Sequence, residues 1–193
     1  MDDAQQKYQV RFDWGRGGYR SLAAAADVVI LADALPPTSG DGETGGETDA
    51  GGAATWRALR DGSGTTDTVI VAGLNNRRAV AEWVLRRQAE KGGRFSVAVV
   101  AAGESRPDGT DRWAVEDLLA AGAVIDALTD VGIDHCSPEA AAASAAFVGL
   151  RQAIKHLVSA SESGQALAAA GRKDAVLAAS RLDVSTEVAV TGN

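Results

Sequence analysis

Apolar positions along this chain follow two periods, one typical of buried strands and one typical of amphipathic helices. Strand-like runs occupy residues 8–12, 27–33, 68–72 and 95–104. Helical patterns at residues 18–26, 76–91 and 113–128 alternate with these runs. This order predicts an α/β fold with three α/β/α layers and a mostly parallel sheet, because right-handed crossovers place helices on both faces of such a sheet.

Helix boundaries in the second half of the chain carry their own signals. Asn75 or Asn76 is expected to cap the helix that follows the third strand. Ser137 followed by a proline predicts the start of another helix, which continues through residue 157. Two shorter helical pieces and a small strand close the chain, at residues 165–170, 174–182 and 187–190. We expect residues 1–193 to form a single domain.

One segment has no apolar periodicity. Residues 36–53 are rich in glycine, threonine and acidic side chains, and they contain too little apolar surface to offset the entropy of ordering them. The sequence therefore predicts a mobile acidic loop between the second and third strands.

The charge balance excludes several classes of partner. Lys and Arg total 19 against 26 Asp and Glu, which gives a net charge of −7 and argues against nucleic acid and against an anionic membrane surface. The apolar runs are far shorter than the ~20 residues of a membrane span, and the start of the chain is acidic where a secretory signal is basic. We therefore expect a cytoplasmic protein. Its one cysteine, Cys136, rules out an internal disulfide.

Polar residues cluster just after the predicted strands. Asp33 ends the second strand, Asn75 follows the third, and Glu104, Glu116 and Asp117 follow the fourth. The carboxyl ends of parallel strands meet at one edge, where open α/β sheets bind their ligands. Asp33 with Glu116 or Asp117 would offer the oxygen ligands that Mg²⁺ prefers.

A purely structural interpretation stands beside the metal site. Acids in the first turn of a helix are favoured by the helix dipole alone. Glu116 and Asp117 are also about 100° apart on a helix, so only one of them is expected to face the sheet.

Two further groups of residues could contact a ligand. Backbone amides at Gly17 and Gly18, in the glycine-rich segment after the first strand, could receive an anion, although plain turn chemistry is the commoner use of such glycines. The run Asp134-His135-Cys136 could supply a Cys-His nucleophile or a metal site, but adjacent side chains in a loop rarely converge, and a simple helix-entry loop is the alternative.

Four segments in order resemble the 2-phosphosulpholactate phosphatase family, as a divergent and shortened member. They are a strand ending in Asp-x-Leu at 28–35, a strand, asparagine and Ala-rich helix at 71–81, a Glu-Asp-x-x-Ala-Ala-Gly element at 116–122, and a closing segment at 163–174. The resemblance implies a three-layer α/β/α fold and Mg²⁺-dependent hydrolysis of a phosphate monoester of a small sulfonated or carboxylated acid. It also implies that Asn75 with Thr38 or Ser39 orients the phosphate.

The chain departs from the family pattern at its main cation. Pro36 stands where the family has an arginine, and the family's central motifs have no convincing counterpart. Arg16, Arg57, Arg77 or Arg78 could replace that charge, and Arg77 is our candidate for substrate binding. Two interpretations follow: a Mg²⁺-dependent phosphatase acting on a small phosphorylated acid, or a catalytically inactive relative that serves as a small-molecule-binding or homodimeric interaction module.

Overall fold

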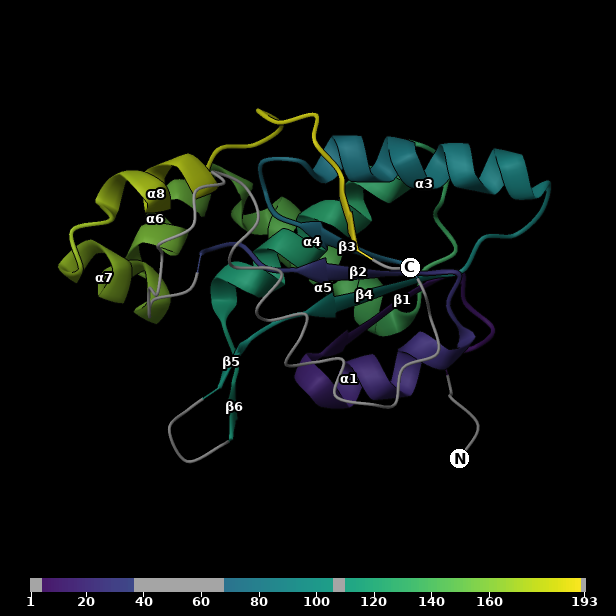
Figure 1. The fold of residues 1–193 in the computed structure, drawn as a ribbon, viewed down its shortest axis with the longest axis horizontal. Helices are drawn as coiled ribbons and strands as arrows, with labels where there is room; N and C mark the ends of the chain where they lie inside the picture. Colours follow the sequence, from purple (N-terminus) through teal and green to yellow (C-terminus); the bar gives the residue numbers. More distant parts are fainter. Residues whose placement is uncertain (1–4, 37–67, 106–109, 192–193) are drawn as a thin grey trace.

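The sheet carries the fold and confirms the predicted α/β class. The computed structural model describes residues 5–36, 68–105 and 110–191 (Figure 1). The main sheet has five strands in the order β1-β4-β2-β3-β7. The first four in that order are parallel, and only the edge strand β7 is antiparallel to its neighbour. Their bounds are β1 Val10–Trp14, β4 Val97–Ala101, β2 Val28–Ala32, β3 Val69–Ala72 and β7 Ala189–Thr191.

Side chains alternate across the central strands and create two separate cores. Val28 and Ile30 join the core beneath α3, α4 and α5, whereas Val29 and Leu31 face the opposite core, which includes residues of α1. Figure 1 shows α1 and α3 on opposite sides of the strands. The helices are α1 Gly15–Leu22, α3 Arg77–Lys91, α4 Val115–Asp130 and α5 Pro138–Leu150. This is the predicted three-layer arrangement.

Close contact between α4 and α5 depends on a glycine. A Cβ placed on Gly122 would lie only 2.1 Å from the carbonyl oxygen of Ala143, so the two backbones approach at a distance that a side chain would prevent. Phe147 fills the same contact, with its Cβ 2.9 Å from that position. The contact fixes α4, whose first turn carries the acids of interest.

Most predicted boundaries are confirmed to within a few residues. Gly92 ends α3 in a left-handed conformation, and the Ser137 hydroxyl accepts a hydrogen bond from the Ala140 amide at the start of α5. The predicted long helix through residue 157 is instead divided into α5, a 3₁₀ turn at Arg151–Ala153 and α6 Ile154–Ala160. Helices α7 Glu162–Ala169 and α8 Lys173–Ala179 then complete a helical group beyond one end of the sheet (Figure 1).

Two local predictions need correction. Helix α1 begins directly after β1, at Gly15, because Gly18 lets the helix lie against Asp13: a Cβ on Gly18 would be 2.7 Å from the Asp13 Cβ. The predicted strand at residues 95–104 is instead divided, since β4 ends at Ala101 and β5 Glu104–Ser105 pairs with β6 Asp111–Arg112 as a small antiparallel hairpin.

Other predictions cannot be placed. Residues 37–53 of the predicted acidic loop, including Thr38 and Ser39, lie outside the described residues. Within the part of the chain that the structure describes, no helix has the length and apolar character needed to cross a membrane.

Candidate functional site

Asp117 lies at the carboxyl edge of the sheet and connects two strand ends. Its Oδ1 accepts a hydrogen bond from the amide of Ala34, just after β2, at 2.9 Å. Its Oδ2 accepts one from the amide of Gly103, just after β4, also at 2.9 Å. These strands are direct neighbours in the sheet. The first turn of α4 therefore reaches the carboxyl edge of the sheet, the edge at which open α/β sheets generally bind ligands.

The electrostatic surroundings of Asp117 oppose its ionisation. Burial raises the pKa of this carboxyl well above its usual range, and the nearby charge of Asp33 raises it further. The hydrogen bonds from the Ala34 and Gly103 amides lower the pKa, while the charge of Glu116 adds to the rise. Asp117 is thus a buried carboxyl with the charge of the half-buried Asp33 nearby, an arrangement that favours a shared proton or a bound cation.

Glu116 is equally buried but points elsewhere. Its Oε1 accepts a hydrogen bond from the Ser163 hydroxyl, which comes from the first turn of α7. Its Oε2 is buried and has no hydrogen-bond partner. The expectation that only one of the two neighbouring acids faces the sheet agrees with this geometry, because Asp117 reaches the strand ends and Glu116 reaches the terminal helices.

Arg112, on β6, joins these elements. Its Nη2 donates to the Glu104 Oε2 and to the Ser163 Oγ, both at 2.6 Å, and lies 3.9 Å from the Glu116 Oε1. Its Nη1 lies 3.5 Å from the Glu162 Oε2. Burial by itself would lower the pKa of Arg112, but the hydrogen bond to Glu104 and the surrounding carboxylates raise it. Arg112 therefore remains a cation among acids.

Sequence reasoning missed Arg112 and Ser163. The signal for Arg112 was present, because the Pro107-Asp108-Gly109 segment between Glu104 and Arg112 is typical of a tight turn that pairs the residues on either side. Ser163 opens the family-like closing segment at 163–174, but nothing local links it to Arg112, which lies 51 residues earlier, and only the packing of α7 brings the two together.

Mg²⁺ fits this site only with few protein ligands. Carboxylate oxygens are the hard donors that Mg²⁺ takes, and it commonly uses one or two of them together with waters and substrate phosphate. Asp33 and Asp117 are two such carboxylates, and the buried Glu116 Oε2, which has no hydrogen-bond partner, belongs to a third in the position before Asp117. Among residues 5–36, 68–105 and 110–191, no group of three or more His, Cys, Asp or Glu side chains is arranged to hold a metal.

Asn75 approaches the same edge through the loop after β3. A Cβ placed on Gly73 would be 3.2 Å from the Asn75 Oδ1 and 3.5 Å from the carbonyl oxygen of Asp33, so this loop lies against the end of β2. Asn76 stands at the N-cap of α3, but its Oδ1 accepts from the Gly73 amide rather than from the helix. The loop is thereby closed on itself, with Asn75 at its tip.

Arg77 is occupied by other parts of the chain. Its side chain is fully buried, its Nη1 donates to Asp126 at 2.9 Å, and its Nε donates to Asp183 at 3.1 Å. Its guanidinium also lies 5.2 Å from the centre of the Phe147 ring. Two carboxylates of the chain itself balance this charge, so the geometry favours a structural role over the substrate contact that we predicted.

The glycine segment after β1 forms helix rather than a loop. Gly17 is exposed in the first turn of α1, while Gly18 is buried against Asp13.

The aromatic rings of Trp14, the last residue of β1, and Trp113, just before α4, are 5.5 Å apart. Trp113 is 56% exposed, so this pair remains open to solvent.

The alternative site around Cys136 is not supported by its surroundings. Burial raises the pKa of the Cys136 thiol, and the charge of Asp134 raises it as well. A nucleophilic cysteine needs the opposite shift. The His135 and Tyr8 ring centres are 5.3 Å apart with the ring planes tilted by 47°, and the adjacent Cys136 forms a parallel β-bridge with Val10 of β1. A structural entry to α5 explains this segment.

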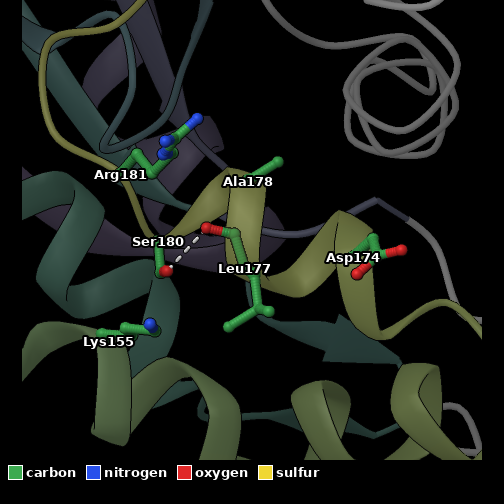
Figure 2. A pocket seen from close by; sticks show the side chains of 6 residues that line it. All are labelled: Lys155, Asp174, Leu177, Ala178, Ser180 and Arg181. Carbon is green, nitrogen blue, oxygen red and sulfur yellow. Dashed lines mark hydrogen bonds between the residues drawn. The ribbon is translucent and has the colours of Figure 1, made fainter.

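A shallow pocket lies elsewhere, between α6 and α8. It encloses about 440 Å³ and is lined by Lys155, Asp174, Leu177, Ala178, Ser180 and Arg181 (Figure 2). The Ser180 hydroxyl donates to the carbonyl of Leu177 within α8, as Figure 2 shows. None of the predicted site residues lines this pocket, so it does not coincide with the acidic edge of the sheet.

A known protein family matches most of the chain. The family model described as 2-phosphosulpholactate phosphatase matches residues 53–193. This range contains Asn75, Glu116 and Asp117, but not Asp33 or the glycines of α1. No curated protein matches the sequence.

Proposed function

From the chain's membership of the 2-phosphosulpholactate phosphatase family, we propose that the acidic edge of the sheet hydrolyses a phosphate monoester of a small sulfonated or carboxylated acid. The family supports phosphatase chemistry, and the placement of Asp117 beside Asp33 supports its location. Hydrolysis of a phosphate ester depends mainly on positioning and on neutralising charge, so a rigid site with converging charged groups suits it.

Asp33 and Asp117 are the residues that we propose to hold Mg²⁺, and Glu116, in the same turn of α4 as Asp117, is the third acid that we propose for the site. Mg²⁺ bound there would neutralise charge on the phosphate oxygens. The two amide hydrogen bonds to Asp117 keep its carboxylate fixed between β2 and β4. In this proposal the Asn75 side chain hydrogen bonds a phosphate oxygen, and Thr38 and Ser39 contribute hydroxyl groups to the same task.

The buried Asp117 carboxyl, with the charge of the half-buried Asp33 nearby, is the observation that carries the proposal. A carboxylate inside a protein is costly unless a cation, a proton or hydrogen bonds compensate it. Asp117 receives two amide hydrogen bonds, yet burial and the charge of Asp33 still raise its pKa strongly. Binding a divalent cation would relieve the repulsion between the two groups, and this gives the arrangement a physical purpose.

Turnover of a panel of phosphate monoesters, including 2-phosphosulpholactate, tests the proposal. We expect hydrolysis with Mg²⁺, none with excess chelator, and a loss of about 100-fold or more in Asp33→Asn, as when a charge-stabilising group is removed from an active site. Asp130→Asn is the matched control, because Asp130 is an exposed acid at the far end of α4. Metal-independent turnover, or full activity in Asp33→Asn, would refute the mechanism.

An inactive relative is the second candidate. Pro36 in place of the arginine that we expected from the family, and the pairing of Arg77 with Asp126 and Asp183, favour it. In that case the folded wild-type protein would hydrolyse none of the esters. Its role would then be to bind a small molecule or to associate with a second copy. Sedimentation of the purified protein would reveal the association.

A further inference from the structure

The Arg112 guanidinium contacts two buried side chains on one side and two more exposed carboxylates on the other. On the inner side its guanidinium contacts Ser163 and Glu116, which are 3% and 2% exposed. On the outer side it contacts Glu104 and Glu162, whose side chains are 38% and 74% exposed. The inner contacts hold the guanidinium in place. Because Arg112 itself is only 8% exposed, an outer carboxylate that turns into solvent must be replaced by another acceptor.

The outer face of this guanidinium already accommodates an acid. The Glu104 Oε2 accepts from Nη2 at 2.6 Å, and Glu104 and Arg112 are directly paired across the β5–β6 hairpin. A planar guanidinium binds carboxylates through its fork of N–H donors, and it binds other oxyanions in the same way. A ligand carboxylate or sulfonate could therefore occupy the place of the Glu104 carboxylate.

Arg112 is also connected to the acidic edge of the sheet. Its Nη2 lies 3.9 Å from the Glu116 Oε1. The next residue, Asp117, accepts a hydrogen bond from the amide of Gly103, which directly precedes β5. The hairpin approaches this segment closely, since a Cβ on Gly103 would be 2.7 Å from the carbonyl oxygen of Arg112. The cation and the carboxyl pair are thus held by one short stretch of chain.

We propose that Arg112 binds the second acid group of the substrate, the carboxylate or sulfonate, and so determines specificity, with Glu104 as the partner that it displaces. The inference rests on the proposed function, because it assigns the acid part of the phosphorylated acid to Arg112. Ser163 acts as a positioning residue, since its hydroxyl lies between the Arg112 Nη2 and the Glu116 Oε1 and orients both.

A purely structural role for Arg112 gives different expectations. If Arg112 only fastens the β5–β6 hairpin to α7, Glu104 supports that attachment, and removing its charge weakens the site. If Glu104 competes with the ligand, removing its charge strengthens ligand binding. The two roles therefore predict opposite signs for Glu104→Gln, which preserves the size and most hydrogen-bonding capacity of the side chain.

Titration calorimetry with two esters separates these roles. The esters are 2-phosphoglycerate and glycerol 2-phosphate, which share a phosphate but differ in the carboxylate. With Mg²⁺ present, we expect Arg112→Lys to weaken 2-phosphoglycerate binding by about 10- to 100-fold, the value of a hydrogen bond to a charged group. We expect glycerol 2-phosphate binding to change by less than about threefold, because that ester has no carboxylate for Arg112 to bind. Glu104→Gln should strengthen 2-phosphoglycerate binding by about two- to fivefold, the value of an exposed ion pair.

Several outcomes would overturn the inference. Equal losses for both esters in Arg112→Lys would show that Arg112 supports the whole site rather than the acid group. Weaker binding of 2-phosphoglycerate in Glu104→Gln would favour the structural role, and so would wild-type protein that binds neither ester. Thermal unfolding of each variant establishes that it folds. If Arg112→Lys does not fold, Glu104→Gln still tests the inference.

Binding and turnover fail independently. If 2-phosphoglycerate binds with the expected dependence on Arg112 but no ester is hydrolysed, the phosphatase proposal fails and the assignment of Arg112 stands. If esters are hydrolysed with Mg²⁺ but Arg112→Lys leaves the preference for 2-phosphoglycerate over glycerol 2-phosphate unchanged, the assignment of Arg112 fails and the phosphatase proposal stands.

Discussion

Replacing Arg77 tests whether this cation serves the fold or the substrate. Arg77 is fully buried at the start of α3 and connects three segments that are distant in the sequence. It donates to Asp126 in α4 and to Asp183 in the segment after α8, and it packs against the Phe147 ring. Arg77→Met keeps the length and apolar stem of the side chain but removes the charge.

The magnitude follows from what the change leaves behind. Breaking a buried ion pair by removing one partner typically costs 3–5 kcal/mol, because the other charge stays uncompensated. Here the Asp126 and Asp183 side chains are 21% and 22% exposed, so water offsets part of that cost. We expect a loss of about 2–4 kcal/mol in the free energy of unfolding, which corresponds to roughly 4–16 °C in Tm for a chain of this length.

Arg78→Met provides the matched control. Arg78 is the next residue and also contacts Asp183, at 3.3 Å, but its side chain is 63% exposed. An exposed ion pair contributes about 0–1 kcal/mol, so this variant should unfold within a few degrees of the wild type. Chemical unfolding followed by circular dichroism measures both variants. Equal stability of the Arg77 and Arg78 variants would refute the structural role, and a loss of ligand binding without a loss of stability would restore Arg77 as a substrate contact.

Three further predictions concern other parts of the molecule. The stability of the metal-free wild type relative to Asp117→Asn should fall as pH rises, because a raised pKa means that the folded state loses stability when Asp117 ionises; unfolding at several pH values checks the sign. Gly122→Ala should lower Tm by far more than Gly149→Ala, since only the first new Cβ meets a backbone oxygen, and a pair of melting curves decides this. Cys136 should react with iodoacetamide more slowly than a free thiol, because its raised pKa reduces the thiolate; equal rates would contradict the burial.

The sequence predicted the layers of the fold because local patterns encode them. Continuous apolar runs marked the strands buried on both faces, and the signals at Ser137 and Gly92 marked helix ends that the structure confirms. Antiparallel pairing of β7 with β3 was not predicted. Three residues at the end of a chain have no pattern that identifies a partner, so tertiary packing alone decides their place.

Helix α1 shows where local patterns mislead. Glycines are poor helix formers, and a segment with three of them suggested a turn. The close approach to Asp13 explains Gly18, because a helix that starts directly after β1 must pass near that strand. The need for a small side chain overrides helix propensity here, and no single-sequence pattern distinguishes the two uses of glycine.

The acids of the candidate site were found because their spacing follows strand ends, whereas the cation was not. Asp33, Glu116 and Asp117 could be named from the β-α order, and the structure brings Asp117 to both neighbouring strand ends. Among the arginines that could supply the cation, Arg77 was the predicted substrate contact. Its partners Asp126 and Asp183 lie 49 and 106 residues away, so nothing local showed that its charge was already balanced.

Charge balance at this edge depends on segments that the family match does not cover equally. The match begins at residue 53, so it includes Asp117 and Arg112 but excludes Asp33. Yet the Asp117 carboxyl bonds the amide next to Asp33, and the charge of Asp33 raises the Asp117 pKa. A change at Asp33 therefore acts on Asp117 through space. If Asp33→Asn lowers the pKa of Asp117, ionisation of Asp117 restores part of the negative charge that is lost at residue 33. The loss of activity in Asp33→Asn would then report on ligand geometry rather than on total charge.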